Sequence, residues 1–373
     1  MLTRRVVLQA GLWASVLAAT PACKKASPPL FDASADVLLG GGKYVDGDDG
    51  DKLKFVLGAF NVDTRQIQPI ATSFFPHSVA IDPRNSMRIC AFEKIGPGAA
   101  EFDLRNLTVR RPLTTSADRL FYGHGAYSAD GERLYATETY QQDRRGVIAV
   151  RRTDTMELIG EFPTFGESPH ECRLVDDGAT MLVTNGGGKL GEDAAPSVCY
   201  IDVASETLLE KIELSNERLN TGHLDIAADG SLIVVSAPRS GLATDQLGGV
   251  SIRPSGGNMQ SIIEPRAVTQ RLKGEALSVA VHSERGIVAV THPDAGMVTF
   301  WRYATRDFLK FLPYTKPRGV TLDLEKNNFL ITHGEDTRVS AIDVDTLEPL
   351  NWSEPYTYIS GSHILNWSSV QDA

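Results

Sequence analysis

Short apolar runs alternate with polar turns along the whole chain. The runs are rich in Val, Ile, Leu and Ala, and most of them end near a Gly, Asp, Asn or Pro. Runs of this length and composition are typical of β-strands, because helices need longer stretches with a 3.6-residue apolar period. We therefore expect a chain built almost entirely of strands and turns.

One unit of this pattern repeats from residue 76 to the C-terminus. It consists of a small or polar lead-in, an anchor residue, a short strand, an Asp-Gly-type turn and a second strand. Residues 123–138 (GHGAYSADGERLYATE) show the whole unit. Successive anchors lie between 42 residues (276 to 318) and 53 residues (170 to 223) apart. The seven anchors are His77, His124, His170, His223, Ala276, Arg318 and His363.

A spacing of this size fits one four-stranded blade of a β-propeller, which takes about 40–50 residues. The seventh copy has only one strand before the chain ends, whereas residues 36–42, 55–62 and 66–71 resemble a second, third and fourth strand without an anchor. The pattern predicts an all-β, seven-bladed β-propeller over residues 35–373, closed by pairing the C-terminal strand with N-terminal strands. Such closure leaves no free sheet edge in the ring. A β-sandwich pair, or a ring of six or eight blades, is the alternative.

The N-terminus carries the features of an export signal, predicted over residues 1–23. Arg4 and Arg5 resemble a twin-arginine motif, and the apolar stretch at residues 10–19 is too short to span a bilayer. The small residues before Cys23 resemble a lipobox, so either a lipid anchor at Cys23 or simple secretion fits. We expect a flexible linker over residues 24–34 and a periplasmic location, with the membrane involved only through that anchor.

Charge and cysteine content narrow the range of partners. The formal net charge is −10, and no cluster of Lys and Arg is larger than a short pair such as Arg110-Arg111. A nucleic-acid partner is therefore not expected, because it needs a basic face. Beyond Cys23, the three cysteines are an odd number, so we expect buried thiols at Cys90, Cys172 and Cys199. We expect a monomer.

The candidate chemistry lies at one mouth of the channel. Each anchor begins an innermost strand, and these strands run in the same direction, so their first residues meet at one mouth. Five anchors are His, out of eight His in the chain. The second strand of each blade runs back to this mouth, so the polar residues at its end are expected there as well. Glu171 and Glu275 are next to anchors and are expected at the same mouth. The predicted metal ligands are His77, His124, His170, His223, His363, His292 and His333. The predicted ligand-binding residues are Glu93, Glu138, Glu171, Asn185, Arg239, Glu275 and Arg318.

Neutral imidazole is the commonest protein ligand for transition metals, so this mouth suits Cu, Fe or Zn. The first hypothesis is therefore a binding protein for a transition metal or a metal-linked small ligand. The alternatives are a metal-dependent oxidoreductase or hydrolase, and a scaffold that docks an envelope protein and has structural histidines. The sequence lacks hydrolase motifs such as Gly-x-Ser-x-Gly, and an enzyme is the less favoured interpretation.

The chain resembles an uncharacterised proteobacterial family of exported β-propellers. The resemblance is carried by the twin-arginine start and by residues 123–128 (GHGAYS), 168–171 (SPHE) and 332–335 (THGE). Members often occur beside imelysin-like proteins, which implies a role in periplasmic iron or copper handling. The family has no established catalytic residues that could be assigned here.

Overall fold

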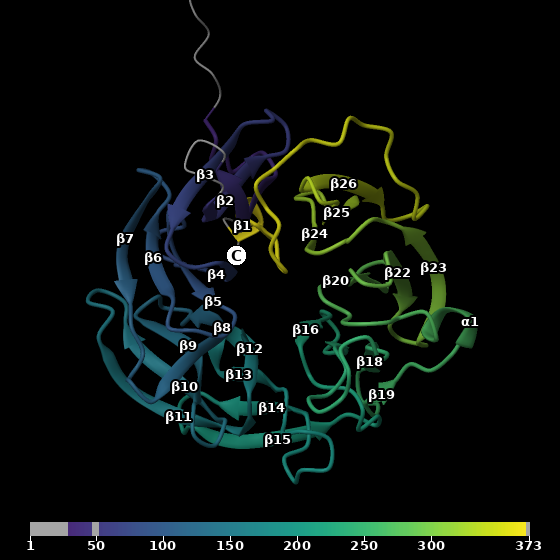
Figure 1. Cartoon of the computed structure of the whole chain (residues 1–373), viewed down its shortest axis with the longest axis horizontal. Coiled ribbons are helices and arrows are strands. Elements are labelled where there is room, and N and C mark those ends of the chain that lie inside the picture. Colours follow the sequence, from purple (N-terminus) through teal and green to yellow (C-terminus); the bar gives the residue numbers. More distant parts are fainter. Residues whose placement is uncertain (1–28, 47–51, 371–373) are drawn as a thin grey trace, which may run out of the picture.

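The strands form seven antiparallel sheets arranged as blades around a central channel (Figure 1). The computed structural model describes residues 29–46 and 52–370. The predicted export signal at residues 1–23 lies outside the described residues, as do residues 24–28 of the predicted linker.

Each blade is numbered here by its place in the ring. Blade 1 consists of β27 (Leu365–Asn366), β1 (Val37–Asp46), β2 (Lys52–Asn61) and β3 (Ile67–Thr72), and blade 2 consists of β4 (Pro76–Ile81), β5 (Arg88–Glu93), β6 (Ala99–Asp103) and β7 (Thr108–Leu113). Blade 3 consists of β8 (Arg119–Tyr127), β9 (Arg133–Tyr140), β10 (Arg145–Arg152) and β11 (Leu158–Glu167). Blade 4 consists of β12 (Pro169–Val175), β13 (Thr180–Asn185), β14 (Ser197–Asp202) and β15 (Thr207–Glu213). Blade 5 consists of β16 (His223–Ile226), β17 (Leu232–Ser236), β18 (Gly249–Arg253) and β19 (Gln260–Ser261). Blade 6 consists of β20 (Val279–His282), β21 (Ile287–His292), β22 (Met297–Arg302) and β23 (Asp307–Pro313). Blade 7 consists of β24 (Val320–Leu322), β25 (Asn328–His333) and β26 (Arg338–Asp343).

Burial decreases from the middle of each blade to its rim. Every residue of β17 is buried, whereas most residues of the outer strand β15 are exposed. The apolar side chains on both faces of the middle strands pack against the neighbouring blades, as Ile233 and Val235 of blade 5 do with Val288 and Val290 of blade 6. The core is therefore divided into layers between blades, which explains why the middle strands read as continuous apolar runs.

Helix is almost absent from the described residues. The one α-helix there, α1 (Arg266–Thr269), has four residues, and no described helix has the length and apolar character that a bilayer crossing requires. Cys90, Cys172 and Cys199 are buried free thiols, as predicted. Burial raises the pKa of Cys90 to about 12, so this thiol stays protonated at neutral pH.

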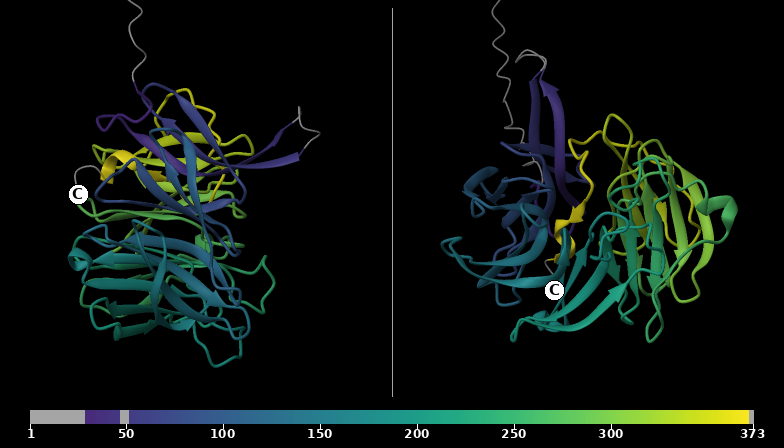
Figure 2. Two further views of the ribbon diagram at one scale, coloured as in Figure 1. Left: turned by 90° about the vertical axis from the view of Figure 1, so that its left-hand side faces the viewer. Right: turned by 60° about the horizontal axis from the view of Figure 1, so that its bottom comes forward.

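The ring closes where the chain ends. Leu38 and Leu39 of β1 pair with Asn366 and Leu365 of β27, so blade 1 combines the C-terminal strand with three N-terminal strands. This confirms the predicted closure. The views in Figure 2 show the C-terminal segment lying against the N-terminal strands, and they show hairpin β1–β2 projecting beyond the body of the ring.

The side chain of Asn366 secures this closure across two blades. Its Nδ2 group donates to Asp36 Oδ1 at 2.6 Å and to the carbonyl oxygen of Leu322 at 3.1 Å. Burial raises the pKa of Asp36, while the hydrogen bond from Asn366 favours its charged form. Nearby, the indole N–H of Trp367 donates to the carbonyl of Ser86 at 2.8 Å, which adds a contact to blade 2.

We expect Asn366→Ala to lower the free energy of unfolding by about 2–3 kcal/mol, because it leaves the carboxylate of Asp36 with only the backbone N–H of Leu324 as donor and removes the donor to the half-buried carbonyl of Leu322. Chemical denaturation followed by tryptophan fluorescence measures the change. The exposed Asn85 provides the matched control, since Asn85→Ala should cost less than about 0.5 kcal/mol. Equal effects of the two substitutions would show that Asn366 does not secure the closure.

Candidate metal centre

Five histidines from five neighbouring blades meet in the channel. They come from β4, β8, β12 and β16 and from the segment just before β27: His77, His124, His170, His223 and His363. Their ring centroids lie between 3.9 Å (His223 to His363) and 5.3 Å (His77 to His223) apart in the contacting pairs. These five residues are called the histidine cluster below.

The cluster brings ligand nitrogens close together. Nε2 of His170 lies 3.1 Å from Nε2 of His77 and 3.3 Å from Nε2 of His223, and Nε2 of His363 lies 3.1 Å from Nε2 of His223. One ligand atom from each of His77, His124, His170 and His223 lies within 4.8 Å of the others. This buried four-histidine group can hold a metal ion.

Threonines on the second strands position the anchors. The hydroxyl of Thr137 donates to the carbonyl of His170 in the next blade at 3.1 Å, and Thr184 donates to the carbonyl of Gly222 at 2.7 Å. Thr291 makes the same contact to the carbonyl of Arg318 at 2.5 Å. Each blade thereby holds the start of the inner strand of its neighbour, so the anchor side chains enter the channel at similar heights.

A glycine makes the close approach of the imidazoles feasible. Gly123 has φ +112°, and a Cβ atom there would lie 2.8 Å from Cε1 of His170 and 3.0 Å from Cδ2 of His77. A larger residue would therefore be strained and would collide with the cluster. The Gly-His pair at 123–124 thus has a direct structural role beside the ligand nitrogens.

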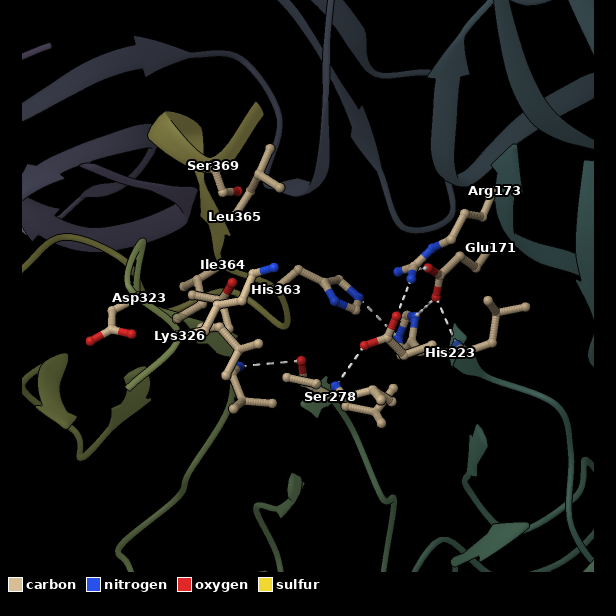
Figure 3. Close-up of a pocket in the computed structure, with 18 of the residues that line it drawn as sticks. Glu171, Arg173, His223, Ser278, Asp323, Lys326, His363, Ile364, Leu365 and Ser369 are labelled. Atoms are coloured by element: carbon tan, nitrogen blue, oxygen red, sulfur yellow. Dashed lines mark hydrogen bonds and ion pairs between the residues drawn. The ribbon is translucent and has the colours of Figure 1, made fainter. Parts of the chain in front are cut away.

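Groups at the far side of two rings, a carbonyl behind His170 and a carboxylate behind His223, bear on which nitrogen faces the cluster. Nδ1–H of His170 donates to the carbonyl of Tyr122 at 2.8 Å, and since a carbonyl only accepts, Nε2 of the neutral ring carries a lone pair. Nδ1 of His223 lies 3.4 Å from Glu171 Oε2, outside good hydrogen-bond geometry, but the carboxylate favours a proton on that nitrogen. Glu171 also accepts from the backbone N–H of Leu224 at 3.0 Å and pairs with Arg173 at 3.2 Å (Figure 3).

The cluster is a neutral, desolvated set of donors. Burial is the largest cause that lowers the pKa of His170, to about 3, and it holds the pKa values of His77, His124, His223 and His363 well below the ordinary value. The ammonium group of Lys94 lowers the pKa of His170 further. Neutral imidazoles at physiological pH are the form that binds metals.

Two cavities adjoin the cluster. The mouth cavity, of about 270 Å³, is lined by His170 and His223 together with residues that precede anchors, such as Tyr122 and Ser168. The inner cavity, of about 580 Å³, is lined by His223 and His363 together with residues that follow anchors, such as Arg173 (Figure 3). Because His223 lines both, a ligand can approach the cluster from either side.

The structure separates His292 and His333 from the cluster. Nε2 of His292 lies 2.9 Å from the hydroxyl of Thr299, and Nε2 of His333 lies 2.8 Å from the hydroxyl of Ser340. Both contacts run from the second strand to the third strand of the same blade. The expectation that second-strand ends form a ring with the anchors therefore does not hold for these two histidines.

Three predicted ligand-binding residues make structural contacts instead, one within a blade and two between neighbouring blades. Glu138 pairs with Arg119 and Arg151 inside blade 3, at 3.3 and 2.6 Å. The amide of Asn185 donates to the carbonyl of Thr164 at 3.0 Å. Arg239 donates to the carbonyls of Gly188 and Ala194, each at 2.9 Å.

Of the four other predicted ligand-binding residues, Glu171, Glu275 and Arg318 lie nearer the cluster, whereas Glu93 contacts a loop of its own blade. Glu171 faces His223, and Glu275 lines the mouth cavity with its carboxylate 3.7 Å from Nζ of Lys94. Arg318 contributes to the lowered pKa of His363, and its buried Nε has no hydrogen-bond partner among the described residues. Glu93 accepts from the backbone N–H of Gly98 at 3.0 Å.

Sequence reasoning missed Lys94, Arg173 and the carbonyl of Tyr122. Lys94 follows the end of a second strand, and Arg173 lies two positions after Glu171, so both could have been found from the repeat. A backbone carbonyl carries no residue-type signal, so its role in orienting His170 emerges only from the fold.

Comparison with known proteins identifies a family and a shared architecture. A family model described as a protein of unknown function (DUF1513) matches residues 74–354. No curated protein sequence matches the chain significantly.

Three solved structures share the fold at low sequence identity. Hydrazine synthase of Kuenenia stuttgartiensis is 14% identical with a TM-score of 0.61, over 79% of this chain and 93% of that one. Dihydro-heme d1 dehydrogenase NirN in complex with DHE is 10% identical with a TM-score of 0.56, over 89% and 69%. A protein from Lactobacillus plantarum is 11% identical with a TM-score of 0.60, over 88% and 98%. Identities this low support a shared fold alone.

We expect the buried His292 to make stability depend on pH. Its pKa is lowered by burial from 6.5 to about 3, so between these values the unfolded chain binds a proton that the folded chain does not. The stabilising contribution is complete above pH 6.5 and is lost as the pH falls toward 3, with an upper limit of about 5 kcal/mol. His292→Gln, which can keep the contact with Thr299, should flatten the plot of unfolding free energy against pH in this window. An unchanged slope would contradict the assignment.

Proposed function

The chain belongs to the DUF1513 family of proteins of unknown function, and we propose that it is an exported protein that binds a transition metal through the histidine cluster. His77, His124, His170 and His223 are the ligands, and His363 lies beside them as a fifth donor. The donor set suits Cu, Fe or Zn, because imidazole binds all three. Binding and handling of the metal is the function, rather than catalysis.

The observation that carries this proposal is the contact between His170 and His223. Their Nε2 atoms lie 3.3 Å apart. The carbonyl of Tyr122 holds Nδ1–H of His170, which leaves a lone pair on its Nε2, and the carboxylate of Glu171 favours the same tautomer for His223. With His223 in that tautomer, two lone pairs face each other at this distance and repel unless a cation lies between them. Protonation is disfavoured, because burial lowers the pKa of both rings. A metal ion relieves the repulsion without adding a proton.

The distances within the cluster support the same conclusion. A tetrahedral metal with metal–nitrogen bonds of about 2.0–2.1 Å separates its ligand nitrogens by about 3.3–3.4 Å. The three Nε2 contacts of 3.1–3.3 Å are close to that value. His77, His170 and His223 therefore need little movement to bind, whereas the four ligand atoms including that of His124 lie within 4.8 Å of one another and must move closer together. A preorganised site costs less ordering free energy.

The pair of Glu171 and Arg173 supports His223 in the same way that carboxylates support metal-bound histidines elsewhere. Such a partner fixes the ring orientation and raises the basicity of the ligating nitrogen. Burial raises the pKa of Glu171, and Arg173 offsets part of that rise by favouring the charged form.

The proposed location is the periplasm, on the basis of the twin-arginine-like start of the sequence. The buried thiols of Cys90, Cys172 and Cys199 fit this route, because a protein that folds before export does so in a reducing compartment. Within this proposal, the exported protein is either attached to the membrane by a lipid on Cys23 or secreted without an anchor.

We expect the protein purified from the periplasm to contain about one transition metal per chain, measured by elemental mass spectrometry. The variant His124→Ala/His170→Ala/His223→Ala should lose this metal while keeping its β-sheet circular dichroism. His292→Gln, which alters a histidine outside the cluster, should retain it. No metal in the wild type, even after reconstitution with Cu, Fe and Zn, would sink the proposal, and protein found only in the cytoplasm would contradict export.

We expect Glu171→Gln to weaken metal affinity by about 10- to 100-fold, because it removes the charge that orients and polarises His223. Competition with a chromophoric chelator measures this affinity at neutral pH. The exposed Glu335→Gln variant is the charge-matched control and should bind metal as the wild type does. Similar affinities for all three proteins would mean that Glu171 has no part in metal binding.

A further inference from the structure

The histidine cluster leaves the charge of a bound metal unbalanced. Its donors are neutral imidazoles, and the nearest carboxylate, Glu171, is already paired with Arg173. The charged groups that lower the pKa values of the cluster, apart from other histidines, are cations: Lys94, Arg173 and Arg318. A divalent ion in such surroundings needs an anion, because an uncompensated charge in a desolvated site is costly.

The mouth cavity has the composition of a small-anion site. The ammonium group of Lys94 lies in its wall, together with the hydroxyl-bearing residues Tyr122 and Ser168 and the amide of Asn220. Asn220 accepts the backbone N–H of Ala237 at its Oδ1 at 2.8 Å, which leaves its NH₂ group for another acceptor. The same cavity touches His170 and His223, so an anion there lies beside the metal.

The inner cavity is less suited to an anion. Its wall holds the cations Arg173 and Lys326 and the carboxylates Glu171, Asp225 and Asp323. Arg173 is already bound to Glu171 and Asp225. In the mouth cavity, by contrast, Lys94 faces one carboxylate, Glu275, at 3.7 Å, a distance longer than a close ion pair.

We propose that the mouth cavity binds a small anion, such as a carboxylate or an oxyanion, that bridges the cluster-bound metal and Lys94. This inference rests on the proposed metal site. The cavity of about 270 Å³ accommodates an anion of a few heavy atoms rather than a large cofactor. Glu275 competes with the anion for Lys94, so its carboxylate lowers the affinity of the cavity for the anion.

The test uses the full mature chain loaded with Cu²⁺ and titrated with azide, followed by the azide-to-copper absorption band. Formate and phosphate then compete with azide. We expect saturable azide binding that weakens at least tenfold in Lys94→Gln and strengthens in Glu275→Gln. Lys310→Gln removes the same charge from the outer strand β23 and should leave azide affinity unchanged. Copper content is measured in every sample.

The outcomes separate the two proposals. Failure of the wild type to bind copper, or any metal, overturns the metal site and this inference together. Stoichiometric copper with no azide band overturns the anion site alone. Azide binding that weakens equally in Lys94→Gln and Lys310→Gln also overturns it, because the effect would then reflect net charge. Opposite shifts in Lys94→Gln and Glu275→Gln, at constant copper content, support it.

Discussion

The pairing of Leu365 and Asn366 with β1 is the constraint on which the rest of the structure depends. Without it, blade 1 has no inner strand and the ring has two open edges. It also places His363, two residues before β27, against His223 and His77. The same closure that stabilises the propeller thus completes the histidine cluster, and residues about 290 positions apart in the chain (77 and 363) become neighbours.

The cluster shows how a propeller can assemble a site from residues that are distant in sequence. Five of the seven blades contribute one histidine each, and threonines such as Thr137 and Thr184 hold the adjacent inner strand in place. The rings are crowded together in a largely desolvated site, which lowers their pKa values and keeps them neutral. Neutral donors bind a metal readily but do not compensate its charge, and that imbalance connects the metal site to the cation-bearing mouth cavity.

The wider repeat explains why some polar residues in the blades have a structural role. Glu138 and Asn185 lie at the same point of their second strands as His292 and His333, and each of the four contacts a group in its own blade or its neighbour. Such buried polar groups require partners, because an unsatisfied donor or acceptor is costly. Position in the repeat alone therefore does not distinguish a residue that faces the channel from one that faces another strand.

The sequence by itself determined the number of blades, the closure by the C-terminal strand and the five histidine anchors, because alternation and spacing are local properties that every copy repeats. Tertiary structure alone decided which polar side chains meet: the packing of the blades brings Nε2 of His170 within 3.3 Å of Nε2 of His223, whereas His292 contacts Thr299. It also decided which nitrogen of His170 faces the cluster, through the backbone carbonyl of Tyr122. Every residue has such a carbonyl, so the sequence does not reveal this contact. Distances of a few ångströms between side chains of different blades depend on how the sheets pack, and a strand pattern does not encode that packing.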